Sequence, residues 1–276
     1  MKNVILFAFF LFCFIFSGKV MGREIKVAIC QMKCIDSDIS GNFSRIEKQV
    51  KEASEKGAEI ALFPETVIIG WVNPDAYKYA EPIPGKFTKR IGEMAKKYKI
   101  LIGISLCEKV KNGIYDSAVM IDKSGKILLK HRKINVLPEL MNPPYIPGKK
   151  EDITAVDTPI GRIGMMICAD SFVDEHLRIM ADKKPDFVYI PYGWAYQKEG
   201  WPEHGFELIK TVQKAAIKIG APVIGPNVVG EITHGPWKGR TYEGLSVASD
   251  GKGILLVQGK HNKEDVIIFN VNIGKK

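Results

Sequence analysis

Apolar and polar residues follow two different periods along this chain. Short apolar runs, typical of buried strands, alternate with segments in which apolar residues recur every three or four positions, as on one face of a helix. The run Ile25–Met32 is strand-like. After it, apolar residues lie at helical spacing until Gly57 ends the segment: Ile46, Val50 and Ala53. This alternation predicts an α/β fold.

The same alternation continues to the end of the chain, interrupted by tight-turn signals and one Pro-rich segment. In the first half, we predict a strand at Glu59–Phe63, a loop at Pro64–Gly85, a helix through Phe87 and Tyr98, a strand at Ile100–Cys107 and hairpin strands at Tyr115–Ile121 and Lys126–Lys130. The middle has an irregular segment at Pro138–Gly148, a strand at Ile163–Cys168 and helical periodicity from about Ser171. The last part has a strand at Phe187–Pro191, a helix at Glu203–Ile219, a strand at Pro222–Val229 and closing strands after Glu243.

Nothing in this order suggests a linker, a repeat or a second domain. A mixed sheet needs helices on one face and a second sheet on the other, so we expect a layered α/β sandwich in one domain over residues 23–276. The composition agrees, because 46% of the 276 residues are apolar and 26% are charged, enough to bury a sizeable core.

The first 22 residues differ from the rest. Lys2 precedes an unbroken apolar run, Val4–Phe16, which small and polar residues follow up to Gly22. This run is short for a membrane span, and the pattern is typical of a signal peptide. We therefore expect residues 1–22 to be a signal peptide or an N-terminal anchor, and the domain to be exported to the periplasm or the extracellular space.

Cysteine spacing and charge exclude several other classes. No Cys-x-x-Cys pair is present, and we expect Cys30 and Cys34 to be buried thiols, with a disulfide between them as the open alternative. The formal net charge of +9 comes from lysine clusters without interleaved aromatic residues, so no nucleic-acid partner is expected. No His-Glu-x-x-His or paired-Cys motif predicts a metal site.

Three residues have the chemistry and the placement of a catalytic group. Cys168 closes a predicted strand, and the carboxyl ends of strands form the crevice of α/β sheets. Glu65 directly follows a strand and Pro64, where it can act as a general base. Lys133 follows the hairpin, and its cation would lower the thiol pKa and stabilise an oxyanion. Each residue alone is weak evidence, because a buried Cys or a solvated Glu or Lys is common.

The order of the three is more specific than any one of them. Phe63-Pro64-Glu65, then Arg132-Lys133, then Ile167-Cys168-Ala169-Asp170 resembles the Glu-Lys-Cys signature of the nitrilase superfamily. The resemblance covers nearly all of the chain after the leader: Val27–Met32, Pro147-Gly148, Thr158–Gly161, Asn227 and Gly244–Ser246.

The resemblance implies a four-layer α-β-β-α sandwich that pairs into a homodimer or a larger even-numbered oligomer. It also implies a hydrolase of non-peptide carbon–nitrogen bonds without metal or cofactor, with Cys168 as nucleophile, Glu65 as proton carrier and Lys133 as oxyanion stabiliser together with the Ala169 amide. Glu139 would be an accessory glutamate, although the segment before it departs from the family pattern. Ala169 stands where relatives often have an aromatic residue.

The expected substrate is a small molecule, an amide or carbamoyl compound in preference to a nitrile. Trp194 is expected to line the substrate pocket. Transfer of the same thioester to another nucleophile, and an exported binding protein without catalysis, stay open as alternatives. A Cys-His hydrolase would use one of the histidines downstream of Cys168: His176, His204 or His234.

Overall fold

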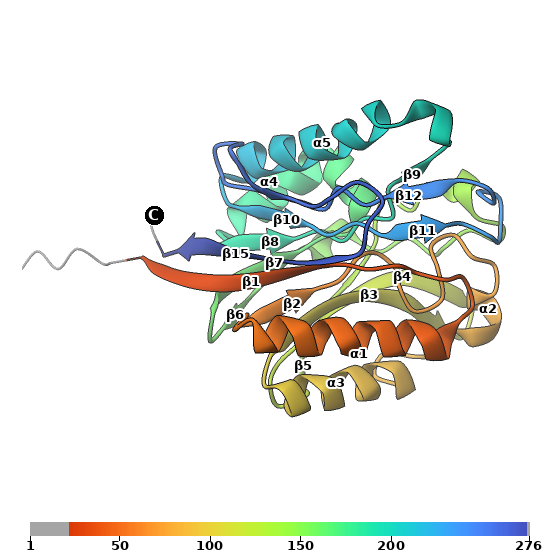
Figure 1. Cartoon of the computed structure of the whole chain (residues 1–276), viewed down its shortest axis with the longest axis horizontal. Helices are drawn as coiled ribbons and strands as arrows, with labels where there is room; N and C mark the ends of the chain where they lie inside the picture. The colour runs from red at the N-terminus through yellow and green to blue at the C-terminus, as the bar shows by residue number, and fades with distance from the viewer. Residues whose placement is uncertain (1–21, 275–276) are drawn as a thin grey trace, which may run out of the picture.

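Two six-stranded sheets form the centre of the molecule in this computed structural model, which describes residues 22–274 (Figure 1). The strand order is β15-β1-β2-β3-β4-β5 in the first sheet and β14-β13-β10-β8-β7-β6 in the second. The first sheet comprises β1 (Arg23–Gln31), β2 (Ile60–Leu62), β3 (Leu101–Val110), β4 (Gly113–Ile121), β5 (Ile127–Arg132) and β15 (Asp265–Ile273). The second comprises β6 (Ala155–Thr158), β7 (Gly161–Met165), β8 (Phe187–Tyr189), β10 (Val223–Gly225), β13 (Val247–Ser249) and β14 (Leu255–Gln258).

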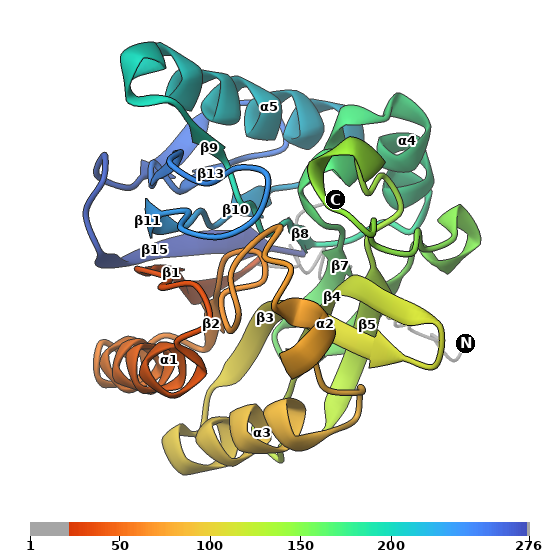
Figure 2. The same cartoon turned by 90° about the vertical axis from the view of Figure 1, so that its right-hand side faces the viewer.

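Helices cover the outer face of each sheet. Figures 1 and 2 show α1 (Ile39–Glu55) and α3 (Lys86–Tyr98) against the first sheet, and α4 (Asp174–Asp182) and α5 (Glu203–Ile219) against the second. The layers therefore run helix, sheet, sheet, helix, which confirms the predicted four-layer sandwich. Short helical segments lie in the connections: α2 (Ala76–Tyr79), η1 (Pro138–Leu140), η2 (Lys150–Asp152), η3 (Cys168–Phe172) and η4 (Lys198–Gly200).

The two-residue period of β1 explains how this strand joins two cores. Ala28 and Cys30 belong to the core beneath α1 and α3, whereas Val27 and Ile29 belong to the core between the two sheets. Both faces of the strand are thus buried, which accounts for its nearly continuous apolar sequence. Cys30, like Cys34 elsewhere in the first core, is a free and buried thiol, as expected.

The structure corrects three predicted boundaries. The strand predicted to end at Cys168 ends at Met165, so that Cys168 opens η3 instead. The strand predicted at Pro222–Val229 is two strands, because the chain leaves the second sheet after Gly225 and re-pairs as β11 (Val229–Glu231) in a small sheet with β12 (Thr241–Glu243) and β9 (Ala195–Tyr196). The loop predicted at Pro64–Gly85 contains α2.

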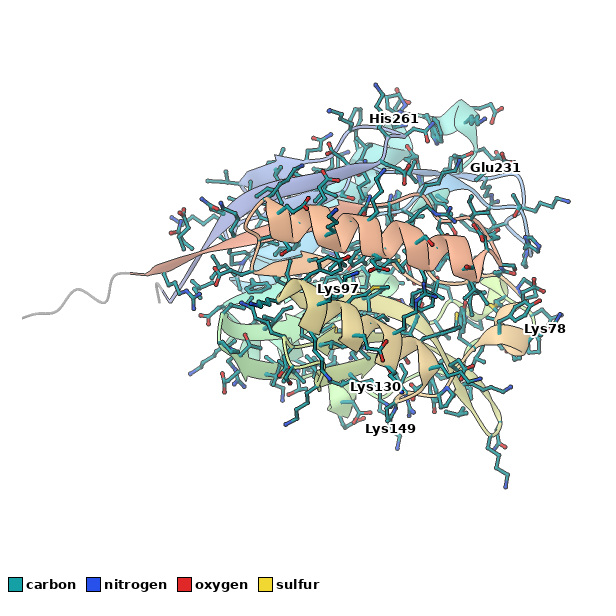
Figure 3. All side chains as sticks on the ribbon, turned by 60° about the horizontal axis from the view of Figure 1, so that its bottom comes forward. Lys78, Lys97, Lys130, Lys149, Glu231 and His261 are labelled. Atoms are coloured by element: carbon teal, nitrogen blue, oxygen red, sulfur yellow. The ribbon has the colours of Figure 1, made fainter. Side chains whose placement is uncertain are left out.

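Surface lysines are partly neutralised by nearby acids. Lys97 on α3 lies 2.8 Å from Glu47, and Lys130 on β5 lies 2.8 Å from Glu108; Figure 3 labels both lysines. No helix among residues 22–274 is long and apolar enough to cross a membrane. The predicted leader lies outside the described residues, except for Gly22.

Candidate active site

Glu65 is buried directly behind the end of β2. Its Oε1 accepts a hydrogen bond from Lys133 Nζ at 2.6 Å, and its Oε2 accepts one from the Gly193 backbone N–H at 2.6 Å. Its own N–H donates to the carbonyl of Tyr192 at 3.3 Å. Both carboxylate oxygens are therefore fixed in orientation by donors from two other strand ends.

Lys133 reaches Glu65 from the end of β5. Its N–H donates to the Asp116 carbonyl at 2.8 Å, which anchors the backbone beside β4. Burial alone would lower the pKa of Lys133, but attraction to Glu65, to Cys168 and to Asp116 outweighs burial and raises it. The folded protein therefore favours the charged ammonium form of Lys133.

Cys168 is held in an unusual backbone conformation at the start of η3. Its φ of 42° is in the left-handed region, which costs energy for a residue with a side chain. Neighbouring bonds fix this turn, because the Cys168 N–H donates to the Pro191 carbonyl at 3.0 Å and the Ser171 hydroxyl donates to the Cys168 carbonyl at 2.7 Å. The tight turn presents the thiol beyond the end of the second sheet.

The thiol of Cys168 is protonated at rest. Burial raises the pKa of Cys168 well above its ordinary value, the charge of Glu65 raises it further, and Lys133 and the Gly193 N–H only partly oppose this. From the sequence alone, we expect Lys133 to lower the pKa of the thiol. The charge of Lys133 does act in that direction, but the pKa is raised overall because burial removes the thiol from water, an effect that the sequence interpretation left out. Nucleophilic attack therefore needs a proton acceptor next to the sulfur, and Glu65 is placed for it.

A cavity of about 290 Å³ opens above Cys168. Glu65 and Lys133 are buried and are not among its lining residues, whereas Gly193, whose N–H holds Glu65, is. Trp194 lies in the wall, and its backbone N–H donates to Asn227 Oδ1 at 2.8 Å. The described lining residues are Trp71, Leu137, Glu139, Leu140, Cys168, Phe172, Gly193, Trp194, Ala195, His204 and Trp237.

The other two residues expected at the site occupy different positions. Glu139, in η1, is exposed and lines the cavity, but no hydrogen bond or ion pair connects it to Glu65 or Lys133 within residues 22–274. The Ala169 side chain is fully buried, and its carbonyl accepts from Asn135 Nδ2 at 3.0 Å. The Ala169 amide follows the nucleophile in the first turn of η3, where N–H groups have no partner within the helix.

Sequence reasoning missed Asp116. This acid lies within β4, fully buried, and its Oδ2 is 3.6 Å from Lys133 Nζ. Ser105 Oγ donates to Oδ1 at 3.1 Å, while no hydrogen bond reaches Oδ2 within the described residues. Burial and then the charge of Glu65 raise the pKa of Asp116 well above its ordinary value. An acid inside the otherwise largely apolar predicted strand Tyr115–Ile121 was the signal that could have identified it.

Asp170 connects the segment that carries Cys168 to the segment that follows Lys133. Its Oδ1 accepts from the N–H groups of Ile134 at 2.8 Å and Asn135 at 2.9 Å. Its Oδ2 accepts from the Ile167 N–H at 3.0 Å and faces His131 Nε2 at 2.9 Å. The sequence motif contained this residue, but the motif gave no indication that it connects the segment of Cys168 to the segment after Lys133.

The histidines of the Cys-His alternative are bonded elsewhere. His176 Nδ1 faces the Asp170 carbonyl at 3.3 Å, and His234 Nδ1 faces the Thr233 hydroxyl at 2.8 Å. His204 lines the cavity, but its Nδ1 lies 2.7 Å from Glu243 Oε1. The thiol's pKa responds to Glu65 and Lys133 instead. Within the described part of the chain, no cluster of three or more His, Cys, Asp or Glu residues could hold a metal ion.

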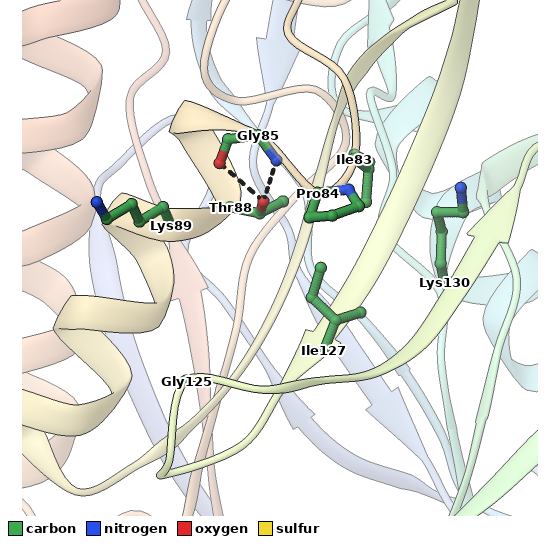
Figure 4. Close-up of a pocket in the computed structure, with 8 residues that line it drawn as sticks. All are labelled: Ile83, Pro84, Gly85, Thr88, Lys89, Gly125, Ile127 and Lys130. Atoms are coloured by element: carbon green, nitrogen blue, oxygen red, sulfur yellow. Dashed lines mark hydrogen bonds between the residues drawn. The ribbon is translucent and has the colours of Figure 1, made fainter.

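A larger cavity, of about 590 Å³, lies away from this chemistry (Figure 4). It is formed by the start of α3 and the turn between β4 and β5, with Thr88, Gly125 and Lys130 among its lining residues. None of Glu65, Lys133 and Cys168 lines it. Because it has no nucleophile or acid–base pair, the smaller cavity above Cys168 is the candidate active site.

The chain is similar in sequence to known amidases. The chain is 31% identical over 185 residues to an omega-amidase of Arabidopsis thaliana, which covers 61% of this chain and 48% of that protein, and 27% identical over 269 residues to an N-carbamoylputrescine amidase of Solanum lycopersicum, which covers 92% and 88%. The matched region thus spans about half the length of the first relative.

A solved carbon-nitrogen hydrolase from Helicobacter pylori has the same fold, with a TM-score of 0.81, 22% sequence identity and coverage of 90% of this chain and 89% of that one. The family model described as carbon-nitrogen hydrolase matches residues 26–275, nearly the whole part of the chain that the structure describes. The chain belongs to the carbon-nitrogen hydrolase family.

Proposed function

We propose that this protein hydrolyses the carbon–nitrogen bond of a small amide or carbamoyl compound through a thioester on Cys168. One observation carries the proposal: a buried carboxylate, Glu65, is bonded to a buried ammonium, Lys133, behind a thiol that opens into a substrate-sized cavity. The names of the relatives, an omega-amidase and an N-carbamoylputrescine amidase, support an amide or carbamoyl group as the target.

In the first step, Glu65 takes the proton of the Cys168 thiol as the sulfur attacks the carbonyl carbon. The carbonyl oxygen becomes an oxyanion, which Lys133 and the Ala169 N–H stabilise. Both donors are fixed before the substrate arrives, Lys133 by Glu65 and the Ala169 amide by the turn at Cys168, so little reorganisation accompanies the charge that develops.

In the second step, protonated Glu65 gives its proton to the departing nitrogen, and ammonia or an amine leaves as the thioester forms. Glu65 then removes a proton from water, the hydroxyl adds to the thioester carbon, and the acid is released as the sulfur regains its proton. One carboxylate thus serves each half-reaction in turn, which predicts ping-pong kinetics.

Transfer of the acyl group to another nucleophile is the second candidate, because the same thioester reacts with an amine or alcohol that reaches it before water. Product analysis in the presence of hydroxylamine distinguishes the two: a hydroxamate in place of most of the acid would favour transfer. A binding protein without catalysis is the less favoured alternative, because it would not need a buried, desolvated Glu–Lys pair beside a thiol.

The test is acid-quenched intact-mass spectrometry of the protein with small amides, carbamoyl compounds and nitriles, with Cys168→Ala as the matched control. An added acyl mass that maps to Cys168 and is absent from the variant is expected with an amide or carbamoyl compound. No adduct and no turnover across the panel would refute the proposal, and an adduct with nitriles alone would refute its substrate class.

We also propose that the chain is exported under the direction of residues 1–22 and that it pairs into an even-numbered homo-oligomer. The apolar leader supports the first proposal and membership of the family the second. Fractionation of expressing cells with N-terminal sequencing tests the first, and light scattering of the purified protein tests the second. A cytoplasmic protein with an intact N-terminus, or a monomer, would contradict them.

A further inference from the structure

The wall of the cavity above Cys168 is largely aromatic. Trp71 and Trp237 pack edge to face with ring centroids 5.2 Å apart, and Phe172 and Trp194 do so at 5.9 Å. Such rings offer apolar contact, and their faces attract cations. The part of a substrate that lies beyond the reacting carbonyl therefore meets a surface suited to an apolar or cationic group.

The charge of the lining is negative. Of the described residues that line the cavity, Glu139 alone carries a carboxylate, and none is a lysine or an arginine. The Glu139 side chain is exposed and makes no hydrogen bond or ion pair within residues 22–274, so its charge is available to a ligand. His204 adds no net positive charge when protonated, because the buried Glu243 lies 2.7 Å from its Nδ1.

Two cations that lie against rings of the cavity lining, Lys133 and Arg240, are already engaged. Lys133 lies beneath the cavity and is paired with Glu65 at 2.6 Å. Arg240 lies outside the lining and stacks on the ring of Trp237, with its guanidinium carbon 3.7 Å from the ring centroid. An anionic substrate would thus meet Glu139 without a lining cation to offset the repulsion, whereas a cationic substrate would find both a counter-ion and aromatic faces.

We propose that this cavity selects amides or carbamoyl compounds whose other end carries an organic ammonium group, with Glu139 as its counter-ion and Trp194 and Phe172 as its aromatic wall. The proposal rests on the hydrolysis at Cys168 proposed above. A volume of about 290 Å³ is near the lower limit of small-molecule sites, so the two ends of the substrate are separated by a short chain.

The test compares three amides of equal chain length that end in an ammonium, a methyl or a carboxylate group. For the full chain at low ionic strength, kcat/KM should decrease in that order. Glu139→Gln should reduce the ratio of kcat/KM for the ammonium over the methyl compound by about three- to tenfold, because it removes the counter-ion and keeps the shape. Arg240→Gln is the matched control and should not reduce this ratio.

Two results would overturn the proposal. If Glu139→Gln lowers kcat equally for the ammonium and methyl compounds and leaves the ratio unchanged, Glu139 acts in the chemistry and not in selection. If the carboxylate compound is the best substrate and Arg240→Gln removes its advantage, the site selects anions.

A binding measurement tests the cation site independently of the proposed hydrolysis. Calorimetry with Cys168→Ala should give tighter binding of the ammonium compound than of the other two, even if none of the three is turned over by the wild-type protein. Equal dissociation constants for all three in Cys168→Ala would refute the cation site. Absence of turnover with preferential binding of the ammonium compound would refute the hydrolysis alone.

Discussion

Asp116 and Lys133 face each other inside the candidate active site, with 3.6 Å between the Oδ2 of the acid and the Nζ of the amine. The same Nζ is already bonded to Glu65, so two buried carboxyl groups share one buried ammonium. Burial and the charge of Glu65 raise the pKa of Asp116 well above its ordinary value, so the fold favours its protonated form. We therefore expect the site to contain one ion pair and one neutral acid.

Replacement of Asp116 tests this protonation state. Asn has the shape of a protonated Asp, so Asp116→Asn should keep at least about a tenth of kcat, whereas Asp116→Leu, which leaves Ser105 without its acceptor, should lose about a hundredfold or more. The measurement is the pH dependence of kcat for both variants, with circular dichroism to check the fold. An Asn variant as inactive as the Leu variant would mean that the charged carboxylate is required.

The Glu65–Lys133 pair allows stability and activity to be separated. Lys133→Met leaves the buried carboxylate of Glu65 without a partner and should lower the free energy of unfolding by about 3–5 kcal/mol. The double variant with Glu65→Gln has no unpaired charge at this position, so it should recover much of that stability while its turnover stays absent. Urea unfolding and an ammonia-release assay measure the two effects. Turnover by either variant would exclude the proposed roles.

Asp170 should contribute to stability in a pH-dependent way. Burial alone would raise the pKa of Asp170, but the bond and charge of His131 and the N–H groups of Asn135 and Ile134 lower it below its ordinary value. The folded protein thus favours the carboxylate, and its contribution is present above the pKa of the unfolded chain and is lost as the pH falls through the folded pKa. Asp170→Asn should therefore destabilise the protein at pH 7 by about 3 kcal/mol or more.

Activity provides a second readout at Asp170. Asp170→Asn loosens the connection between the segments that follow Lys133 and that carry Cys168, so kcat should fall more than KM rises, in the fraction that remains folded. Unfolding measured from pH 7 down to well below pH 3.8, the ordinary pKa of Asp, tests the stability part. Equal stability of the variant and the wild type at pH 7 would show that the carboxylate is not the centre of this connection.

Sequence could predict those residues of the candidate site that stand near strand ends or in a motif, and not those that are recognised only by their neighbours in the fold. Lys133 directly follows β5, Glu65 and Cys168 lie three residues beyond the ends of β2 and β7, and the order of the three along the chain is specific, so the strand pattern and the motif indicated them together. Asp116 is inside a strand, where a pattern of apolar residues treats one acid as an exception. Its role depends on the distance to Lys133, which only the fold provides.

Boundaries failed for a related reason. The prediction extended the strand to Cys168 because the residues from Met165 to Ile167 are apolar, but the chain turns there with Cys168 at positive φ, held by a long-range bond to Pro191 and a local bond from Ser171. The residues around Cys168 do not reveal which distant part of the chain will bond to it. In the same way, the segment Pro222–Val229 is apolar enough for one strand. Asn227 within it bonds to Gly244 and Trp194, at the point where the chain leaves the second six-stranded sheet for the small sheet that contains β11.

Glu108 on β3 provides an acid-sensitive interaction away from the active site. Burial alone would raise its pKa, but hydrogen bonds from Arg132, Lys130 and Ser117 lower the pKa of Glu108 to about 2 from an ordinary value of 4.5. These bonds are all 2.8 Å long and connect three neighbouring strands. Because the folded pKa is depressed, the stabilisation is complete above about pH 4.5 and is lost as the pH falls towards 2.

Glu108→Gln should therefore lower the free energy of unfolding at pH 7 by about 1–2 kcal/mol, a value reduced for the partial exposure of Arg132 and Lys130. The difference from the wild type should shrink between pH 4.5 and pH 2, as the wild-type carboxylate is protonated. Glu47→Gln is the matched control, since Glu47 forms a more exposed pair with Lys97 and should change stability by about 0.5 kcal/mol or less. A Glu108→Gln difference that stays constant from pH 7 to pH 2 would mean that the variant acts through packing and not through the charge of Glu108.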